Sequence, residues 1–295
     1  MNFLSKFRTS QFVKNVINKI NPYELQVPIG HFYSPVPNIN EIRLQGESLF
    51  ENKSTLGIDL NIEKHFNYIQ DFSKFYNEIP YSDEVNENLK YKYANEMFGK
   101  STGVLLYSFI RYLNPKNIIE VGSGHSSALM YDVNKLFYND SINLTFIEPY
   151  PERLRRLFKN DIQKVNLIEK KVQEVDLDVF KKLNENDILF IDSSHVSKVG
   201  SDVNKLLFEI LPILNKFVYI HIHDVFYPFE YPKSWINNGT FWNELYLLRA
   251  FLMYNDNFSV EFLNTYAIDN CKDALKKYPL FSENIGGSIW IKKIQ

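Results

Sequence analysis

The sequence predicts an α/β fold with a parallel β-sheet, and two observations support this prediction. From about residue 90 onward, short apolar runs alternate regularly with helical stretches. The runs are apolar throughout, which is typical of parallel strands covered by helices on both faces. The expected strands cover residues 118–121, 144–147, 165–168, 188–191, 218–222, 260–263 and 288–291. The expected helices cover residues 126–137, 152–158, 177–183, 203–211 and 241–254.

The chain before this alternation is expected to form a helical and lid region over residues 1–90, followed by the α/β domain over residues 91–295. Residues 21–60 are punctuated by prolines and glycines, which indicates irregular structure. A segment of this length without helix or strand is expected to cover a functional site. A helix is expected next, over residues 61–79.

The first twenty residues are basic and apolar and contain no acidic residue. Two interpretations remain open for them: a helix lying on a membrane surface, or a helix packed on its own domain or on a second copy of the chain. Both rest on apolar residues that recur at helical spacing, namely Phe3, Phe7, Phe12, Val16 and Ile20.

Composition excludes several classes of protein. Of the 295 residues, 45% are hydrophobic and 23% are charged, which is the balance of a globular chain and not of a disordered one. The formal net charge of -2 provides no basic field for nucleic acid. Cys271 has no second cysteine to pair with, no apolar run is long enough to span a bilayer, and basic residues interrupt the N-terminal apolar stretches. We therefore expect a cytoplasmic protein.

Polar residues follow four of the predicted strands at the point where each strand ends. After the first strand, Gly122, Ser123 and Gly124 allow the backbone to turn tightly and approach a ligand, and Ser126 is placed to cap the next helix. The second strand is followed by Glu148, where a carboxylate can accept both hydrogen bonds of a ribose diol.

The fourth and fifth strands also end in ionisable residues. Asp192 and His195 follow the fourth strand, and His223 and Asp224 follow the fifth. Right-handed crossovers bring the carboxyl ends of parallel strands to one edge, so these residues predict a nucleotide-type site there. His221 is expected to be a core histidine.

The glycine loop favours S-adenosylmethionine (SAM) over a dinucleotide. Ser127 occupies the third glycine position of the dinucleotide fingerprint. Glu120 stands directly before the loop, where its negative charge opposes a diphosphate and suits a cationic amino acid. SAM carries an ammonium and a sulfonium and no phosphate.

Longer motifs make the chain similar to a known family. The segments 120–124 and 146–149, with the order of the seven apolar runs, resemble the class I SAM-dependent methyltransferases. Further segments resemble a bacterial subgroup associated with surface-polysaccharide or secondary-metabolite genes: 32–37, 56–60, 192–198, 221–232 and 243–251. The resemblance covers about residues 30–295. It implies a Rossmann-like seven-stranded sheet in the order 3-2-1-4-5-7-6, with the last strand antiparallel.

The resemblance also implies roles for individual residues in binding SAM. Glu120 and the loop from Gly122 to Gly124 would hold the methionine end, and Glu148 would bind the ribose hydroxyls. Val172 and Gln173 would flank the adenine. Ser126 and Asp192 complete the expected cofactor contacts.

A more distant resemblance, to the metal-dependent sugar O-methyltransferases of macrolide biosynthesis, implies a divalent metal. Asp192, His223 and Asp224 would be its ligands, and His195 would be the general base. His223 stands where that family has an acid, and an imidazole ligand favours manganese, iron or zinc over magnesium. Whether the metal is magnesium, manganese or iron, or is absent, stays open here.

An aromatic loop follows the fifth strand and is expected to present an acceptor platform, because sugar rings stack on aromatic side chains. Its members are Tyr227, Tyr231 and Trp235, and Tyr33 of the lid segment is expected to join them. Packing of the loop itself is the alternative.

These observations predict a SAM-dependent O-methyltransferase that acts on a sugar, a glycan or a hydroxylated small molecule. SAM makes the methyl group reactive, so the protein must position the acceptor and remove its proton, for which His195 or a metal is suited. Two alternatives remain: a metal-dependent oxygenase with a His/carboxylate site, and a non-catalytic protein with a SAM-binding fold.

Overall fold

The structure is a computed structural model that describes residues 26–295 apart from 52–53, 85 and 96. The described residues fall into two compact units. The smaller lies within Met1–Glu51 and Ser234–Phe241, and the larger within Asn52–Lys233 and Trp242–Gln295. The amphipathic stretch predicted over the first twenty residues lies outside the described residues.

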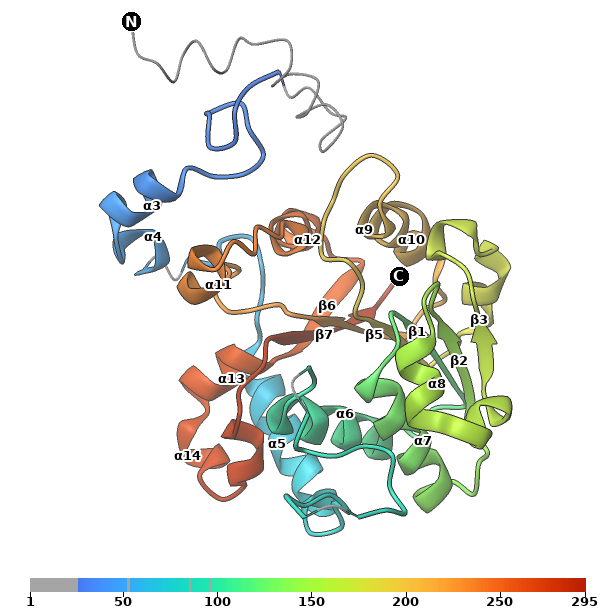
Figure 1. Cartoon of the computed structure of the whole chain (residues 1–295). Coiled ribbons are helices and arrows are strands. Elements are labelled where there is room, and N and C mark those ends of the chain that lie inside the picture. Colours follow the sequence, from blue (N-terminus) through green and yellow to red (C-terminus); the bar gives the residue numbers. More distant parts are fainter. Residues whose placement is uncertain (1–25, 52–53, 85, 96) are drawn as a thin grey trace, which may run out of the picture. The chain divides into compact units, whose positions relative to one another are not determined.

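The larger unit contains a seven-stranded sheet in the order β3-β2-β1-β4-β5-β7-β6 (Figure 1). Strands β1 to β5 run parallel to one another, whereas β7 runs antiparallel to both β5 and β6. The predicted topology is therefore confirmed. The strands are β1 (Asn117–Val121), β2 (Asn143–Ile147), β3 (Asn166–Ile168), β4 (Ile188–Ile191), β5 (Tyr219–His223), β6 (Phe258–Leu263) and β7 (Ser288–Lys293).

Strand β1 lies at the centre of the sheet, where the strand order reverses. It pairs with β2 on one side and with β4 on the other, and Glu120 is in register with Phe146 and Phe190. All four residues of β4 and all five of β5 are buried, as expected for strands with both faces covered. The carboxyl ends of β1, β2, β4 and β5 meet at one edge, which is the position for a ligand in open α/β sheets.

Helices cover both faces of the sheet in the larger unit (Figure 1). One layer contains α5 (Ile62–Tyr76), α6 (Lys100–Leu113), α7 (His125–Phe137) and α8 (Glu152–Phe158), with α13 (Asn264–Asn270) and α14 (Lys272–Leu275) beside α5. The other contains α9 (Asp202–Lys205), a π-helical turn (Leu206–Ile210), α10 (Leu211–Ile213) and α12 (Glu244–Leu252).

The division into units differs from the boundary expected at residue 90. Helix α5 packs against α6 and β6, and its Phe72 is fully buried in the main core. This helix therefore belongs with the sheet, and the units divide next to residue 51. The smaller unit contains α3 (Ile39–Gln45), α4 (Ser48–Glu51) and most of α11 (Lys233–Asn237).

Among the described residues, no helix combines the length and the hydrophobicity that crossing a membrane requires.

Candidate active site

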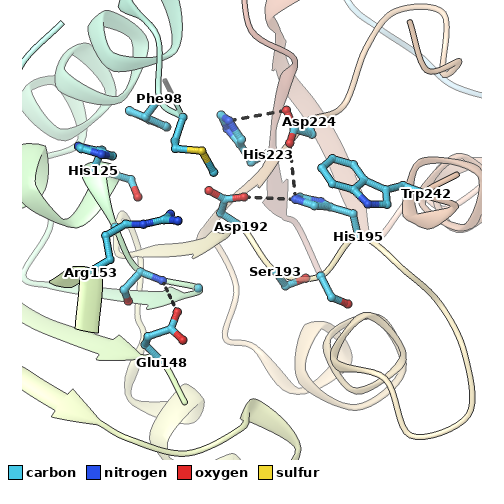
Figure 2. A pocket seen from close by; sticks show the side chains of 16 residues that line it. Phe98, His125, Glu148, Arg153, Asp192, Ser193, His195, His223, Asp224 and Trp242 are labelled. Carbon is cyan, nitrogen blue, oxygen red and sulfur yellow. Dashed lines mark hydrogen bonds and ion pairs between the residues drawn. The ribbon is translucent and has the colours of Figure 1, made fainter. Parts of the chain in front are cut away.

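The loops that follow β1, β2, β4 and β5 line two adjoining cavities of the larger unit, of about 370 and 520 Å³. Gly122, Glu148, Asp192, Ser193 and Ser194 line both of them. The first cavity is also lined by Met97, Phe98, Ser123, Gly124, His125, Ser126, Arg153, His195, His223, Asp224 and Trp242 (Figure 2). The second extends to Tyr150, Val172, Gln173, Lys198 and Asp202.

Gly122 permits the ends of β1 and β4 to touch. Its φ is +82°, and a Cβ at this position would lie 1.8 Å from the backbone oxygen of Asp192. The Gly122 amide donates to the Ile147 carbonyl, while the Asp192 amide donates to that of Val121. Only glycine fits, because any side chain would push these two strand ends apart.

Glu148 lies between the two cavities, as its position after β2 predicts. One carboxylate oxygen accepts the Ser123 amide at 3.1 Å, and the other accepts the Tyr150 amide at 2.8 Å. Val172 and Gln173 lie in the wall of the larger cavity, and the Gln173 side chain donates to the Gly200 carbonyl. The structure thus brings together the residues expected around a ribose and an adenine.

Glu120 occupies a different place from the one expected. Its side chain is fully buried, and the hydroxyls of Ser126 and Ser127 donate to its two carboxylate oxygens. Burial raises its pKa to about 8, against the opposing effect of the serine hydroxyls. Glu120 is not among the cavity-lining residues, so we correct its role. Its hydrogen bonds connect β1 to the first turn of α7, and its carboxylate does not face the cavity.

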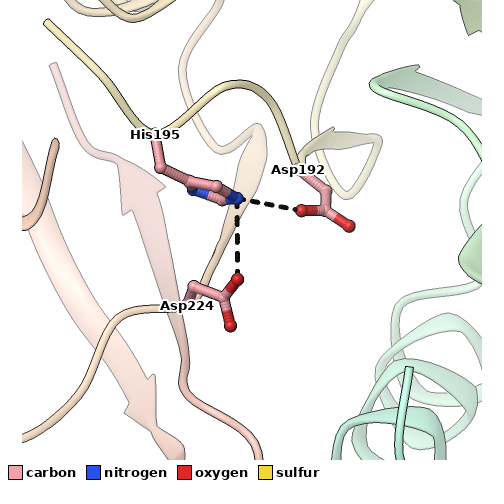
Figure 3. A group of neighbouring side chains, drawn as sticks. All are labelled: Asp192, His195 and Asp224. Atoms are coloured by element: carbon pink, nitrogen blue, oxygen red, sulfur yellow. Dashed lines mark ion pairs between the residues drawn. The ribbon is translucent and has the colours of Figure 1, made fainter. Parts of the chain in front are cut away.

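His195 is the most highly connected ionisable residue at the sheet edge. Its Nδ1 lies 2.8 Å from the carboxylate of Glu244, and its Nε2 lies 3.3 Å from Asp192 and 3.5 Å from Asp224 (Figure 3). The ring is buried and packs on Trp242, with 4.3 Å between the ring centroids.

The surrounding carboxylates decide the charge of His195. Burial lowers its pKa, but the hydrogen bonds to Asp192 and Glu244 outweigh this effect and raise the pKa to about 10. His195 therefore carries a proton at neutral pH while all three carboxylates face it. At that pH it can act as a base only when a positive charge offsets the Asp192 and Asp224 carboxylates near Nε2.

His223 and Asp224 complete the edge at the end of β5. Asp224 lies 3.8 Å from Nε2 of His223, and its backbone amide donates to the Gly287 carbonyl. Nδ1 of His223 lies 3.4 Å from Nε2 of His221. His221 is buried in the core as predicted, with its ring stacked on Phe190 and its pKa well below the ordinary value because of burial.

The donor set at this edge suits a divalent cation. One ligand atom each of Asp192, His195 and Asp224 lie within 4.8 Å of one another (Figure 3). Two carboxylates and an imidazole are competent ligands for manganese, iron or zinc. The cluster contains His195 where the predicted set has His223. His223 lies next to it, with Nε2 3.8 Å from the Asp224 carboxylate.

Two members of the predicted aromatic platform, Tyr227 and Tyr231, do not line either cavity. Tyr231 is buried and its hydroxyl accepts the Leu245 amide, so we withdraw it as an acceptor contact. Tyr227 packs edge-on against Tyr266, outside the lining of the two cavities. Tyr33 and Trp235 belong to the smaller unit. In the larger unit the aromatic residues beside His195 and His223 are Trp242 and Phe98.

Sequence reasoning missed several residues of the site. Arg153, His125 and Met97 line the first cavity, and Glu244 holds His195. Arg153 had a signal, because it lies in the first turn of the helix that follows Glu148. Glu244 had none in the local sequence, because 49 positions separate it from His195.

Sequence comparisons relate the chain to known proteins. A family model described as a methyltransferase domain matches residues 119–225. A protein of Archaeoglobus fulgidus, described as uncharacterized, is 41% identical over 169 residues, which are 55% of this chain and 75% of the relative.

Two solved structures are similar in fold. SAH-bound methyltransferase PaMTH1 of Podospora anserina has a TM-score of 0.43 at 17% identity, over 92% of this chain and 100% of that one. The O-methyltransferase TomG of Streptomyces achromogenes, in complex with SAM, has a TM-score of 0.42 at 13% identity, over 84% of this chain and 94% of that one.

Proposed function

The chain belongs to the class I SAM-dependent methyltransferases, and we propose that it transfers the methyl group of SAM to a hydroxyl oxygen of a sugar, a glycan or another hydroxylated small molecule. The observation that carries this proposal is the position of His195. Its Nε2 lies between Asp192 and Asp224 in the wall of a cavity that Gly122 and Glu148 also line. The position of this imidazole next to the expected cofactor supports a role for it in removing the proton of the acceptor hydroxyl.

The described residues fit SAM. Glu148 is placed to accept the ribose hydroxyls, and Val172 and Gln173 are placed to flank the adenine. The first turn of α7 and the guanidinium of Arg153 face the same cavity as Gly124, where they suit the carboxylate of the methionine portion. Bound SAM supplies an electrophilic methyl group on a positively charged sulfur.

The residues of the protein must then remove the proton of the acceptor hydroxyl. A sugar hydroxyl is a poor nucleophile at neutral pH, so its proton must be removed as the methyl group is transferred. His195 would take that proton on Nε2. Trp242, which packs on the His195 ring, would limit the ring to one orientation.

We further propose a divalent cation held by Asp192, His223 and Asp224. Two carboxylates and an imidazole make a donor set that fits manganese or iron, and the Asp224 carboxylate lies 3.8 Å from Nε2 of His223. Such an ion would polarise the acceptor hydroxyl and lower its pKa. Engaging Asp192 and Asp224 with a cation also removes the two carboxylates that hold a proton on Nε2 of His195, which frees this residue to act as a base.

Aromatic contacts support an acceptor with a sugar-like ring. Trp242 lines the cavity next to His195, and Phe98 lines it next to His223. Either ring suits the C–H face of a sugar. Tyr33, Tyr227 and Trp235 remain predicted acceptor contacts.

Methyl transfer is tested with SAM that carries a labelled methyl group. The purified protein is incubated with monosaccharides, oligosaccharides and hydroxylated aromatic compounds, and products are detected by mass spectrometry. We expect S-adenosylhomocysteine (SAH), which is SAM without its methyl group, and an O-methylated product in equal amounts. A protein that binds no SAM but requires Fe(II) and consumes oxygen with a co-substrate would instead be an oxygenase.

Glu148→Ala is expected to weaken SAM binding by about 1.5–3 kcal/mol for each charged hydrogen bond lost, and non-additively, because the ribose hydroxyls lose their carboxylate acceptor. Titration calorimetry measures the change. Glu152→Ala is the control, since Glu152 is exposed in the first turn of α8. Equal SAM affinity of the Glu148 variant and the wild type would remove Glu148 from the cofactor site.

A further inference from the structure

Glu244 is a buried carboxylate that the mechanism above does not use. It is the first residue of α12 and is 3% exposed. Its Oε2 lies 2.8 Å from Nδ1 of His195, which is the shortest of the three contacts between this ring and a carboxylate. The other two contacts, to Asp192 and Asp224, involve Nε2. Glu244 therefore engages the side of the ring opposite the two aspartates.

The backbone makes a second connection between the same two residues. The amides of Asn243 and Glu244 both donate to the carbonyl oxygen of His195 at 3.1 Å. His195 adopts a left-handed backbone conformation with φ of +58°, which non-glycine residues rarely adopt. The carbonyl of His195 thus caps the first turn of α12 while its ring contacts the first side chain of that helix.

Neighbouring contacts limit the remaining freedom of this loop. The side chain of Asn243 accepts the Ser197 amide and donates to the Ser197 carbonyl. Trp242 packs against the His195 ring at an interplanar angle of 30°. Three successive residues therefore hold the loop that contains His195. Asn243 binds the loop backbone, Trp242 packs on the face of the His195 ring, and Glu244 contacts Nδ1 of that ring.

Hydrogen-bond chemistry fixes the direction of the Glu244 contact. Burial raises the pKa of Glu244, whereas the hydrogen bond to His195 lowers it. In its ionised form Glu244 only accepts hydrogen bonds, and the proton of this contact then lies on Nδ1 of His195. The proton on Nδ1 is held at 2.8 Å, whereas Nε2 has longer contacts of 3.3 and 3.5 Å. Of the two ring nitrogens, Nε2 is therefore the one free to exchange a proton, and it is the nitrogen that faces Asp192 and Asp224.

We propose that Glu244 is the positioning residue of His195: it holds a proton on Nδ1 and thereby directs the lone pair of Nε2 toward the acceptor hydroxyl. This inference rests on the proposed O-methyl transfer. As the C–O bond to the methyl group forms and the S–C bond breaks, the hydroxyl proton moves to Nε2 and SAH leaves. The resulting imidazolium keeps its Nδ1 proton paired with the Glu244 carboxylate.

A purely structural role for Glu244 makes a different prediction. In that case its loss would lower the thermal stability of the protein without affecting the His195 ring specifically. Glu244→Gln separates the two roles, because glutamine has the same shape but places a neutral amide next to Nδ1. The matched control is Glu209→Gln, which removes an exposed carboxylate from the π-helical turn.

The experiment is NMR on protein labelled with ¹⁵N in histidine, with His195→Gln used to assign the resonance. We expect an imidazole proton that correlates with Nδ1 of His195, exchanges slowly with water, shifts in Glu244→Gln and disappears in Glu244→Ala. Glu209→Gln should leave it unchanged. A resonance that persists in Glu244→Ala, or a proton bound only to Nε2, would overturn the inference.

Kinetics then test the effect on catalysis, with the acceptor that the labelled-SAM screen identifies. Loss of an orienting partner costs about 10- to 100-fold in comparable sites, so Glu244→Gln should lower kcat by that order while KM and SAM affinity change little. An unchanged kcat would overturn the positioning role even if the resonance behaves as expected. Failure of the wild type to transfer a methyl group would refute the proposed function, and with it the positioning role, whereas the NMR result would still report whether the pair exists.

Discussion

His195→Gln is expected to lower kcat for methyl transfer by about 10²- to 10⁴-fold, because a positioned base contributes a rate factor of that size. Glutamine occupies a similar volume but cannot take up a proton. SAM affinity should change little, since the predicted cofactor contacts come from Glu148, Val172, Gln173 and the loop after β1. Stopped assays of SAH formation and titration calorimetry measure the two quantities.

The pH dependence gives a second measure of the same role. The pKa of His195 is raised to about 10 in the ligand-free chain, so its proton is bound below that pH and lost above it. Wild-type kcat should therefore rise with pH as Nε2 loses its proton. The midpoint should lie near 10 without a cation and move toward the ordinary histidine value when a cation engages Asp192 and Asp224. The variant should lack this rise.

His65→Gln distinguishes a loss of chemistry from a loss of stability. His65 is fully buried, accepts the Leu263 amide and lies outside the lining of both cavities. Its variant should melt at a lower temperature yet keep its kcat. A stable His195→Gln protein that binds SAM normally and retains nearly the wild-type kcat would refute the role of His195 as a base.

The sheet was predictable because its strands carry an unambiguous signal. Residues such as Ile188–Ile191 are apolar without interruption, and only a strand buried on both faces needs this pattern. Helix α6 was not predicted: eleven of its fourteen residues are buried, so its stability comes largely from tertiary packing. Residues 177–182 form a 3₁₀ helix where a longer helix was expected.

The strand-end residues of the site were also predictable from the sequence. Parallel strands bring their carboxyl ends to one edge, so Glu148, Asp192, His195 and Asp224 had to lie near one another. The sequence did not reveal that Glu148 lines the cavities while Glu120 does not. Glu120 lies within β1 and points toward the serines of α7, and this orientation depends on tertiary packing.

Long-range partners lie beyond what local patterns reveal. Glu244 meets His195 only because α12 begins where the loop after β4 passes, and no spacing rule connects the two positions. The same holds for Trp242 and Phe98, whose contacts with the site histidines depend on loop paths. The path of the loop after β5 likewise buries Tyr231, which was predicted to contact the acceptor.

Removal of divalent metal is expected to abolish methyl transfer at neutral pH while leaving SAM binding largely intact. Asp192 and Asp224 would then face each other across the protonated His195, which cannot accept the hydroxyl proton. Manganese should restore activity better than calcium, because calcium prefers a shell made only of oxygen ligands. Elemental analysis before and after chelation, followed by metal add-back, measures the effect.

Two histidine variants show which ring binds the metal. If Asp192, His223 and Asp224 are the ligands, His223→Gln should weaken manganese binding in calorimetry, and His195→Gln should leave it nearly unchanged. The reverse result would assign the ion to Asp192, His195 and Asp224, whose ligand atoms lie within 4.8 Å of one another, and would exclude His195 as the base. Asp273→Asn is the control, because Asp273 is exposed and pairs only with Lys276 among the described ion pairs. Full turnover after chelation, with no metal detected, would show that the two aspartates act on His195 without an ion.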